Sequence, residues 1–277
     1  MIRTAAILAR GLGTRMRRAD ADARLAHSQA AAADIGMKGM IPIGDDSGEG
    51  QARPFLDYVL SELADAGVTE IVLVLGPEHV AVREYYTQTA PPKRVRMRFA
   101  VQVEPVGTAN AVVAAASVIG DEPFLVLNAD NFYPREALRW LAAGTSAATI
   151  AFDRDALVRD GNIDRERVRA FAVLELSADD RLLSIVEKPG DTLDLESDAA
   201  RWVGMNCWAV TPTIVDACRR VPKSSRGEFE LPEAVAVAIR EGVEVRVERV
   251  ALPVLDLSQR ADIPAVVARL SSVTPRP

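Results

Sequence analysis

Short apolar segments alternate with helical patterns through the first half of the chain, and this alternation restricts the fold more than any other feature. The strand-like segments are rich in aliphatic and β-branched residues and span residues 3–8, 70–76, 95–102 and 123–130. Segments with apolar residues at helical spacing lie between them, at 54–66, 78–87 and 108–118. This order predicts an α/β fold with three α/β/α layers and a mixed, mostly parallel central sheet.

The rhythm changes after about residue 145. Strand patterns at 148–152, 170–176 and 182–188 follow one another without helices between them, and residues 177–180 suit a hairpin turn. A further strand is expected at 202–210 and a last helix at about 259–270. We expect an added antiparallel platform, and one continuous domain over residues 1–277 with parts at about 1–145 and 146–258. The segments 17–37 and 153–169 are expected as surface excursions.

Composition excludes several classes of function. The net charge of −6 opposes nucleic-acid binding, so a phosphate site must come from a local basic cluster. Only two histidines, His27 and His79, argue against a histidine-rich zinc site. Two cysteines, Cys207 and Cys218, form no CxxC pair, which favours a reducing cytoplasm. We expect no membrane span, because no apolar run approaches about 18 residues.

A glycine-rich turn, LARGLGTRM (8–16), follows the first strand pattern. Gly11 and Gly13 allow the backbone to approach a phosphate, and Thr14 and Arg15 add a hydroxyl and a guanidinium. The alternative is a tight strand-to-helix turn without a ligand. The third glycine of the dinucleotide fingerprint is absent, and so is the Gly-Lys-Ser/Thr end of a P-loop.

Two aspartates follow apolar runs. Asp130 ends LNAD (127–130), where a parallel sheet places its ligands, and Asp256 lies in VLDLS (254–258). Together with substrate phosphates they would suit magnesium. For Asp256, a helix cap is an equal alternative.

Two further segments suit a phosphorylated substrate and a base. Glu187 and Lys188 close a strand pattern and are suited to a hydroxyl and a phosphate; the alternative is a surface turn before Pro189, where charged pairs are common. Gln102 has a two-sided amide that can pair with a base, and Gly107 with Thr108 begins a helix whose N-terminus favours anions. The alternative is a Thr108 cap beside an exposed Gln102.

Together and in this order, these motifs resemble the sugar-1-phosphate nucleotidylyltransferases, over about residues 3–258. Lys38 before MIPIG (40–44), GMNCWAVTP (204–212) and RGEFELPEAV (226–235) complete the pattern. The resemblance implies a Rossmann-like fold and transfer of a nucleotide, from UTP or dTTP by default, to a sugar 1-phosphate with release of pyrophosphate. It implies Mg²⁺ as cofactor and leaves a homo-oligomer possible.

The resemblance also implies roles for individual residues. Asp130 and Asp256 would hold the metal, and Arg15, Lys38, Asp130 and Lys188 would be catalytic. The sugar phosphate would contact Asn131, Glu187, Lys188 and Asn206. The nucleotide would contact Leu8, Ala9, Gly11, Gly13, Thr14, Arg15, Gln102, Gly107 and Thr108.

The chain departs from the family pattern in two places near the site. Arg10 replaces the first glycine of a Gly-Gly pair, so it would clash with the base or stack on it. Lys38 follows Arg15 by an unusually long segment. These departures keep open a non-catalytic regulatory homologue, beside a cytidylyltransferase acting on another phosphorylated substrate. A dinucleotide-dependent oxidoreductase is disfavoured, because no acid ends the second strand pattern.

Overall fold

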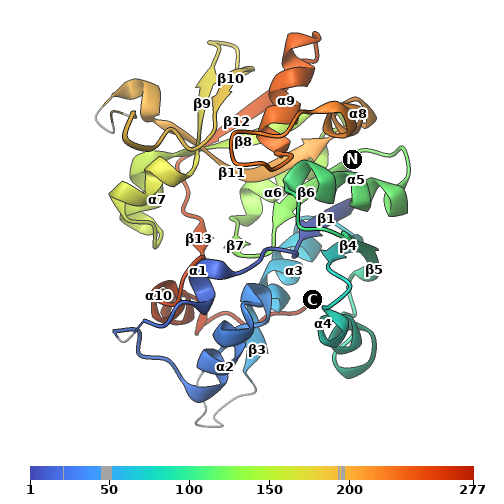
Figure 1. The fold of residues 1–277 in the computed structure, drawn as a ribbon. Coiled ribbons are helices and arrows are strands. Elements are labelled where there is room, and N and C mark those ends of the chain that lie inside the picture. The colour runs from blue at the N-terminus through green and yellow to red at the C-terminus, as the bar shows by residue number, and fades with distance from the viewer. Residues whose placement is uncertain (21, 45–51, 193, 195–196) are drawn as a thin grey trace.

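A computed structural model describes residues 1–20, 22–44, 52–192, 194 and 197–277. Within these residues, nine strands form one mixed sheet in the order β10-β9-β11-β6-β1-β4-β5, with β8 beside β11 and β12 beside β8 (Figure 1). The strands are β1 Thr4–Leu8, β4 Glu70–Leu75, β5 Arg96–Val101, β6 Phe124–Asn128, β8 Ala148–Asp153, β9 Ala172–Leu176, β10 Leu182–Val186, β11 Trp202–Val210 and β12 Arg246–Val250.

The two halves of the sheet pair differently. Strands β6, β1, β4 and β5 pair in parallel, as the alternating pattern predicted. Strand β11 joins β6 antiparallel and carries antiparallel β8, β9 and β10 beyond it, which confirms the added platform. One continuous sheet therefore connects the segments expected to bind the two substrates.

Helices cover both faces of this sheet. Among those packed on the sheet cores are α3 Phe55–Asp65, α5 Thr108–Ile119, α6 Arg135–Ala143, α8 Pro212–Arg220 and α9 Leu231–Arg240. Further helices include α1 Thr14–Arg17, α2 His27–Ile35, α4 Val80–Glu84, α7 Arg154–Asp160 and α10 Asp262–Leu270. Of the helices in the described residues, none is long and apolar enough to cross a bilayer.

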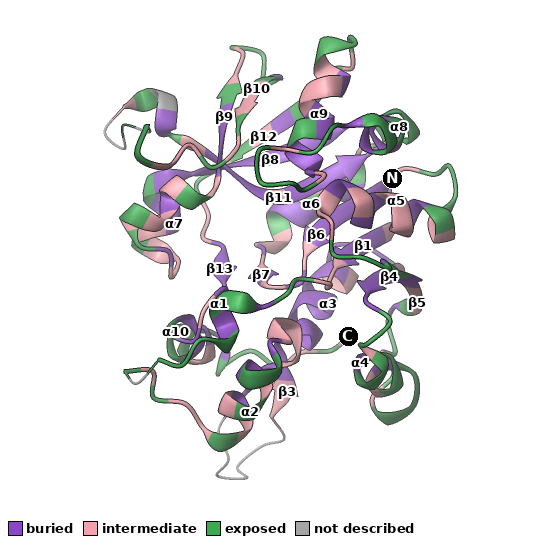
Figure 2. Cartoon of the chain, viewed as in Figure 1, coloured by how far each residue is buried: buried purple, intermediate pink, exposed green. Residues whose placement is uncertain are grey.

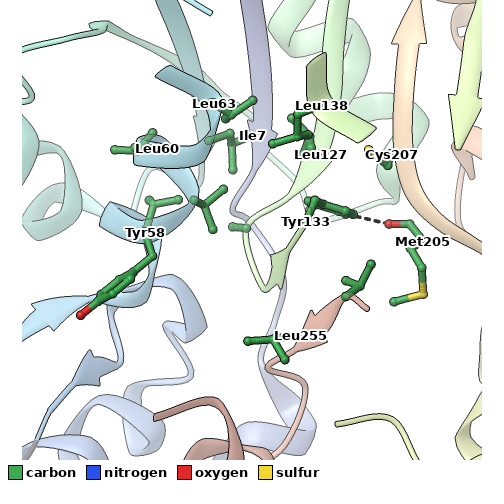
Figure 3. Packing of buried hydrophobic residues seen from close by; sticks show 14 of the residues in the cluster. Ile7, Tyr58, Leu60, Leu63, Leu127, Tyr133, Leu138, Met205, Cys207 and Leu255 are labelled. Atoms are coloured by element: carbon green, nitrogen blue, oxygen red, sulfur yellow. Dashed lines mark hydrogen bonds between the residues drawn. The ribbon is translucent and has the colours of Figure 1, made fainter. Parts of the chain in front are cut away.

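Alternate residues of the central strands enter two separate cores. Ala5 and Ile7 of β1 pack into the core under α3 and α6, whereas Ala6 packs into the core under α5, α8 and α9. The period of two follows from strand geometry, in which neighbouring side chains point to opposite faces. The central strands β1, β4 and β6 are buried over most of their length (Figure 2), and Ile7 lies close to Leu63 and Leu127 in Figure 3. The three-layer prediction is therefore confirmed.

One prediction about the second half is wrong. Helix α7 and a 3₁₀ helix at Arg165–Ala170 separate β8 from β9, where we expected no helix. The Asp153 carboxylate accepts a hydrogen bond from Ala156 N at 3.0 Å and caps α7, while Leu157 is buried. A cap and a short apolar face therefore stabilise a helix inside the segment 153–169, which was expected only as a surface excursion.

The segment 17–37 also contains a helix. In α2, the Gln29 side chain is buried and donates to the carbonyl oxygens of Pro42 and Gly44, while Ala33 packs into the core. Figure 1 shows α1 and α2 beside α10, and Arg260 joins them by donating to Met16 O at 2.9 Å and pairing with Asp34. This segment, called the insertion below (residues 17–37), is thus anchored to the C-terminal part of the chain.

Candidate active site

A cleft of about 380 Å³ opens at the carboxyl ends of β1, β4 and β6. This edge is where parallel sheets place ligands, because the strand ends and the loops after them converge there. Eleven of the predicted residues line the cleft: Leu8, Ala9, Gly11, Gly13, Thr14, Arg15, Lys38, Gln102, Gly107, Thr108 and Asp130.

The glycine-rich turn is packed tightly at one glycine and open at the other. Gly13 has φ 60°, and a Cβ atom there would lie 2.3 Å from the carbonyl oxygen of Gly36. At Gly11 a Cβ atom would meet nothing within 4 Å. Gly13 therefore lets the insertion pack against the turn, whereas the space beside Gly11 belongs to the cleft. Thr14 and Arg15 follow at the start of α1 and are exposed.

Gly13→Ala should destabilise the protein by more than about 1 kcal/mol, because the new methyl group overlaps backbone and the left-handed conformation strains alanine. Gly11→Ala is the matched control and should change the free energy of unfolding by less than about 0.5 kcal/mol. Urea denaturation of both variants measures the difference. Equal stabilities would show that the turn does not depend on the Gly13–Gly36 contact.

Lys38 reaches the site despite the long segment before it. A 3₁₀ turn, Lys38–Met40, directs its side chain to Asp130, where Nζ and Oδ2 are 2.6 Å apart. Both side chains are mostly shielded, with 18% and 22% of their surfaces exposed. The pair places one cation and one carboxylate side by side on the cleft wall.

Asp256 lies behind Asp130 through a short antiparallel pairing. Strand β13, Leu255–Asp256, pairs with β7, Asn131–Phe132, and Leu257 N donates to Asp130 O at 2.8 Å. The Asp256 carboxylate accepts from Asn131 Nδ2 at 2.9 Å, from Ser258 Oγ at 3.0 Å and from the Arg167 guanidinium. It does not cap α10, which begins at Asp262, so the alternative of a helix cap is wrong.

Burial and the nearby charge of Asp130 raise the pKa of Asp256 to about 6, although the Arg167 guanidinium opposes this shift. A bound divalent cation would favour the charged form of Asp256, because its positive charge offsets the nearby negative charge of Asp130. Among the described residues, no cluster of three or more acidic, histidine or cysteine side chains supplies a complete metal cage. The pair therefore fits Mg²⁺ with phosphate and water oxygens as its other ligands, which is how that ion is usually held.

Another part of the cleft wall is built around Gln102. Its side chain is buried, and Nε2 donates to Gly107 O and to Asn110 Oδ1, both at 3.0 Å. A Cβ atom on Gly107 would lie 2.3 Å from Phe229 O, so glycine permits the 224–230 loop to approach. Thr108 does not cap α5, because its hydroxyl instead accepts from Leu231 N at 2.8 Å. The alternative of an exposed Gln102 beside a Thr108 cap is wrong.

The predicted sugar-phosphate residues lie outside the lining of this cleft. Lys188 is 45% exposed with φ 44°, and its Nζ is 3.6 Å from Glu187 Oε1. Burial raises the pKa of Glu187, whose carboxylate is also 3.6 Å from the Arg226 guanidinium. Arg226 belongs to the 224–230 loop, and Glu228 of that loop lines the cleft. Glu187 and Lys188 are thus connected to the site through this loop.

Asn131 and Asn206 both contact the Tyr133 hydroxyl, Asn206 through its main-chain oxygen at 3.4 Å. The Tyr133 hydroxyl donates to Met205 O at 2.7 Å (Figure 3) and lies 3.3 Å from Asn131 Oδ1. Asn206 has φ 52° at a bulge in β11, and its Oδ1 accepts from the Trp208 indole at 3.3 Å. The Asn131 side chain itself supports Asp256.

Sequence reasoning missed several residues of the site. His79 and Glu228 line the cleft, and Arg167 holds Asp256. Arg167 lies in the 153–169 segment, 89 residues from Asp256, and no pattern joins the two. For His79, its place just after an apolar strand was an available signal.

A sheet edge with a glycine-rich turn, a buried amide and paired carboxylates defines a nucleotide-binding α/β enzyme. A family profile described as nucleotidyl transferase matches residues 38–249, which is more than half of the chain. The chain belongs to the nucleotidyl transferase family.

Individual sequence relatives and solved structures are also similar to this chain. The chain is 26% identical over 271 residues to the UTP–glucose-1-phosphate uridylyltransferase AglF of Haloferax volcanii, covering 98% of this chain and 97% of that protein. It is 28% identical over 250 residues to a glucose-1-phosphate thymidylyltransferase of Streptomyces antibioticus, covering 87% of this chain and 59% of that one. The fold matches a UTP-bound UGPase of Acinetobacter baumannii with a TM-score of 0.73 and 18% identity, over 99% and 96% of the two chains.

Proposed function

We propose that this enzyme transfers a nucleotidyl group from UTP or dTTP to a sugar 1-phosphate, glucose 1-phosphate first among them, and releases pyrophosphate. The observation that carries the proposal is that the glycine-rich turn, the Lys38–Asp130 pair and Gln102 line one cleft. The names of AglF and of the thymidylyltransferase supply the two nucleotides and the sugar phosphate.

The assigned residues suit this reaction. An oxygen of the sugar phosphate attacks the α-phosphorus, the bond to the β-phosphate breaks, and pyrophosphate leaves with the electron pair. The attacking phosphate is already ionised at neutral pH, so the chain has no need of a general base. Arg15 and Lys38 supply positive charge against the repulsion of two polyanions, and the backbone N–H groups at Gly11 and Gly13 bind phosphate oxygens.

Asp130 and Asp256 would hold Mg²⁺, which supplies positive charge to the phosphates when bound. On the sugar side we assign Asn131, Glu187, Lys188 and Asn206. For Glu187 and Lys188, this assignment is supported by the contact of Glu187 with Arg226 of the 224–230 loop. We further propose that residues 1–277 act as one domain, since one sheet joins both halves, and that the enzyme is cytoplasmic.

Pyrophosphate release tests the proposal directly. Each nucleoside triphosphate is incubated with glucose 1-phosphate and Mg²⁺, and the nucleotide sugar is identified by mass. We expect release with UTP or dTTP and its loss when EDTA removes the metal. Binding of the triphosphate without release over a panel of sugar phosphates would instead establish the non-catalytic homologue, and release with CTP and another phosphorylated alcohol would establish the cytidylyltransferase.

A further inference from the structure

Arg10 is fixed on the wall of the cleft that carries Gln102. Its Nη1 donates to the main-chain oxygen of Gln102, and its Nε and Nη2 each lie 3.4 Å from the Glu78 carboxylate. Only 10% of the Arg10 side chain is exposed, and Arg10 lines the cleft together with Leu75, Gln102 and Gly107. The guanidinium is therefore held in one place instead of moving freely in solvent.

The end of β4 leaves space for this guanidinium. A Cβ atom on Gly76 would lie 2.5 Å from Arg10 Nε and 2.3 Å from Glu78 Oε1. Gly76 has no left-handed conformation that would require glycine. The missing side chain at position 76 thus makes room for the Arg10–Glu78 pair.

Hydrogen bonding around Gln102 determines what the amide can offer to a base. Gly107 O can only accept, so Gln102 Nε2 faces it and Oε1 remains as an acceptor. A guanidinium has five N–H bonds and no acceptor. The contacts to Gln102 O and Glu78 use three of them, which leaves two donors on Arg10.

We propose that Arg10 and Gln102 together select a base with a lactam edge, an N–H beside a carbonyl oxygen, with Arg10 donating to the carbonyl and Gln102 Oε1 accepting from the N–H. Uracil and thymine present this edge as N3–H and the C4 carbonyl oxygen. At the same two positions cytosine presents an unprotonated N3 and an amino group. Gln102 Oε1 would then face a second acceptor, and the Arg10 guanidinium would face another donor. The inference rests on the proposed function, because it places the base of the triphosphate at this wall.

UTP and CTP differ only at this edge and are therefore the matched probes. Calorimetric dissociation constants are measured for both with the wild-type protein, Arg10→Met, Gly76→Ala and the control Arg83→Met. Arg83 lies on α4 outside the cleft lining, with its guanidinium 5.3 Å from the Phe99 ring centroid. We expect the wild type to bind UTP at least about tenfold more tightly than CTP, since a charge-assisted hydrogen bond to a buried carbonyl has about this effect.

In Arg10→Met the preference for UTP should fall by about tenfold, and in Gly76→Ala it should fall in the same direction because the guanidinium is displaced. Arg83→Met should keep the wild-type ratio. An unchanged ratio in Arg10→Met, or a wild type that binds UTP and CTP equally, overturns the inference. If pyrophosphate is released with UTP and CTP alike, the proposed function stands and this inference fails. If UTP is preferred in binding but no transfer occurs, the inference stands and the proposed function fails.

Discussion

Asp130→Asn should lower turnover by about a hundredfold or more, which corresponds to about 2.7 kcal/mol of lost transition-state stabilisation. The carboxylate lies on the cleft wall against Lys38, and its charge acts on Asp256 behind it. Asparagine keeps the size of the side chain but removes the negative charge that would hold a divalent cation. The lower turnover should therefore result from a slower chemical step.

Steady-state pyrophosphate release measures this effect, with the Mg²⁺ concentration varied at each substrate level. We expect a higher Mg²⁺ concentration for half-maximal rate in Asp130→Asn, which a purely structural defect would not produce. Asp216→Asn is the matched control, because Asp216 is 61% exposed on α8 and pairs only with Arg219 among the described residues. Turnover near the wild-type value in a folded Asp130→Asn protein would remove Asp130 from the mechanism.

The alternating pattern of the first half was sufficient to predict the sheet because β1, β4 and β6 at its centre are buried on both faces over most of their length. The apolar run after Glu70 is buried continuously in β4, as is typical of a strand that has helices on both faces of a parallel sheet. The order of motifs then placed Gly11, Gly13, Gln102 and Asp130 at one sheet edge, since parallel strands all end there. Local pattern and topology were therefore enough for this part of the site.

Contacts between distant segments could not be predicted in the same way. The carboxylate of Asp256 is held by Arg167, and the insertion that carries Asp34 is tied down by Arg260. Each arginine lies in a charged or irregular segment, where the sequence does not show which arginine pairs with which carboxylate. Such pairings depend on loop conformation, and loops, unlike helices and strands, have no repeating hydrophobic pattern in the sequence.

Arg10 was recognised in the sequence as unusual, but its contacts could not be predicted. The glycine-rich turn made Arg10 visible as a departure, but its effect depended on what lay opposite. The structure shows Gly76 and Glu78 providing space and a counter-charge, so the large side chain neither blocks the cleft nor stays free. A substitution in a motif is thus interpretable only with its neighbours in space.

Arg167→Met should destabilise the protein by about 3 kcal/mol or more at neutral pH. Arg167 pairs with both Asp256 and Asp262, whose side chains are 3% and 4% exposed. Methionine fills similar volume but leaves a buried carboxylate without its cation, and this unpaired charge is the main cost. Arg159→Met is the control, because Arg159 is 66% exposed and should cost less than about 0.5 kcal/mol.

The loss in Arg167→Met should also grow with pH. The pKa of Asp256 is about 6 in the folded protein, above the value near 3.9 of an unfolded chain, so the folded state binds more protons between these values. Stability therefore falls as pH rises through this window. Without Arg167 the pKa of Asp256 rises further, which extends the fall in stability above pH 6.

Denaturation at pH 5.5 and pH 8 measures this effect. The stabilities of Arg167→Met and the wild type should differ more at the higher pH, and Asp256→Asn in the Arg167→Met background should restore part of the lost stability. If the loss were the same at both pH values and the second substitution restored nothing, Arg167 would contribute packing and not charge.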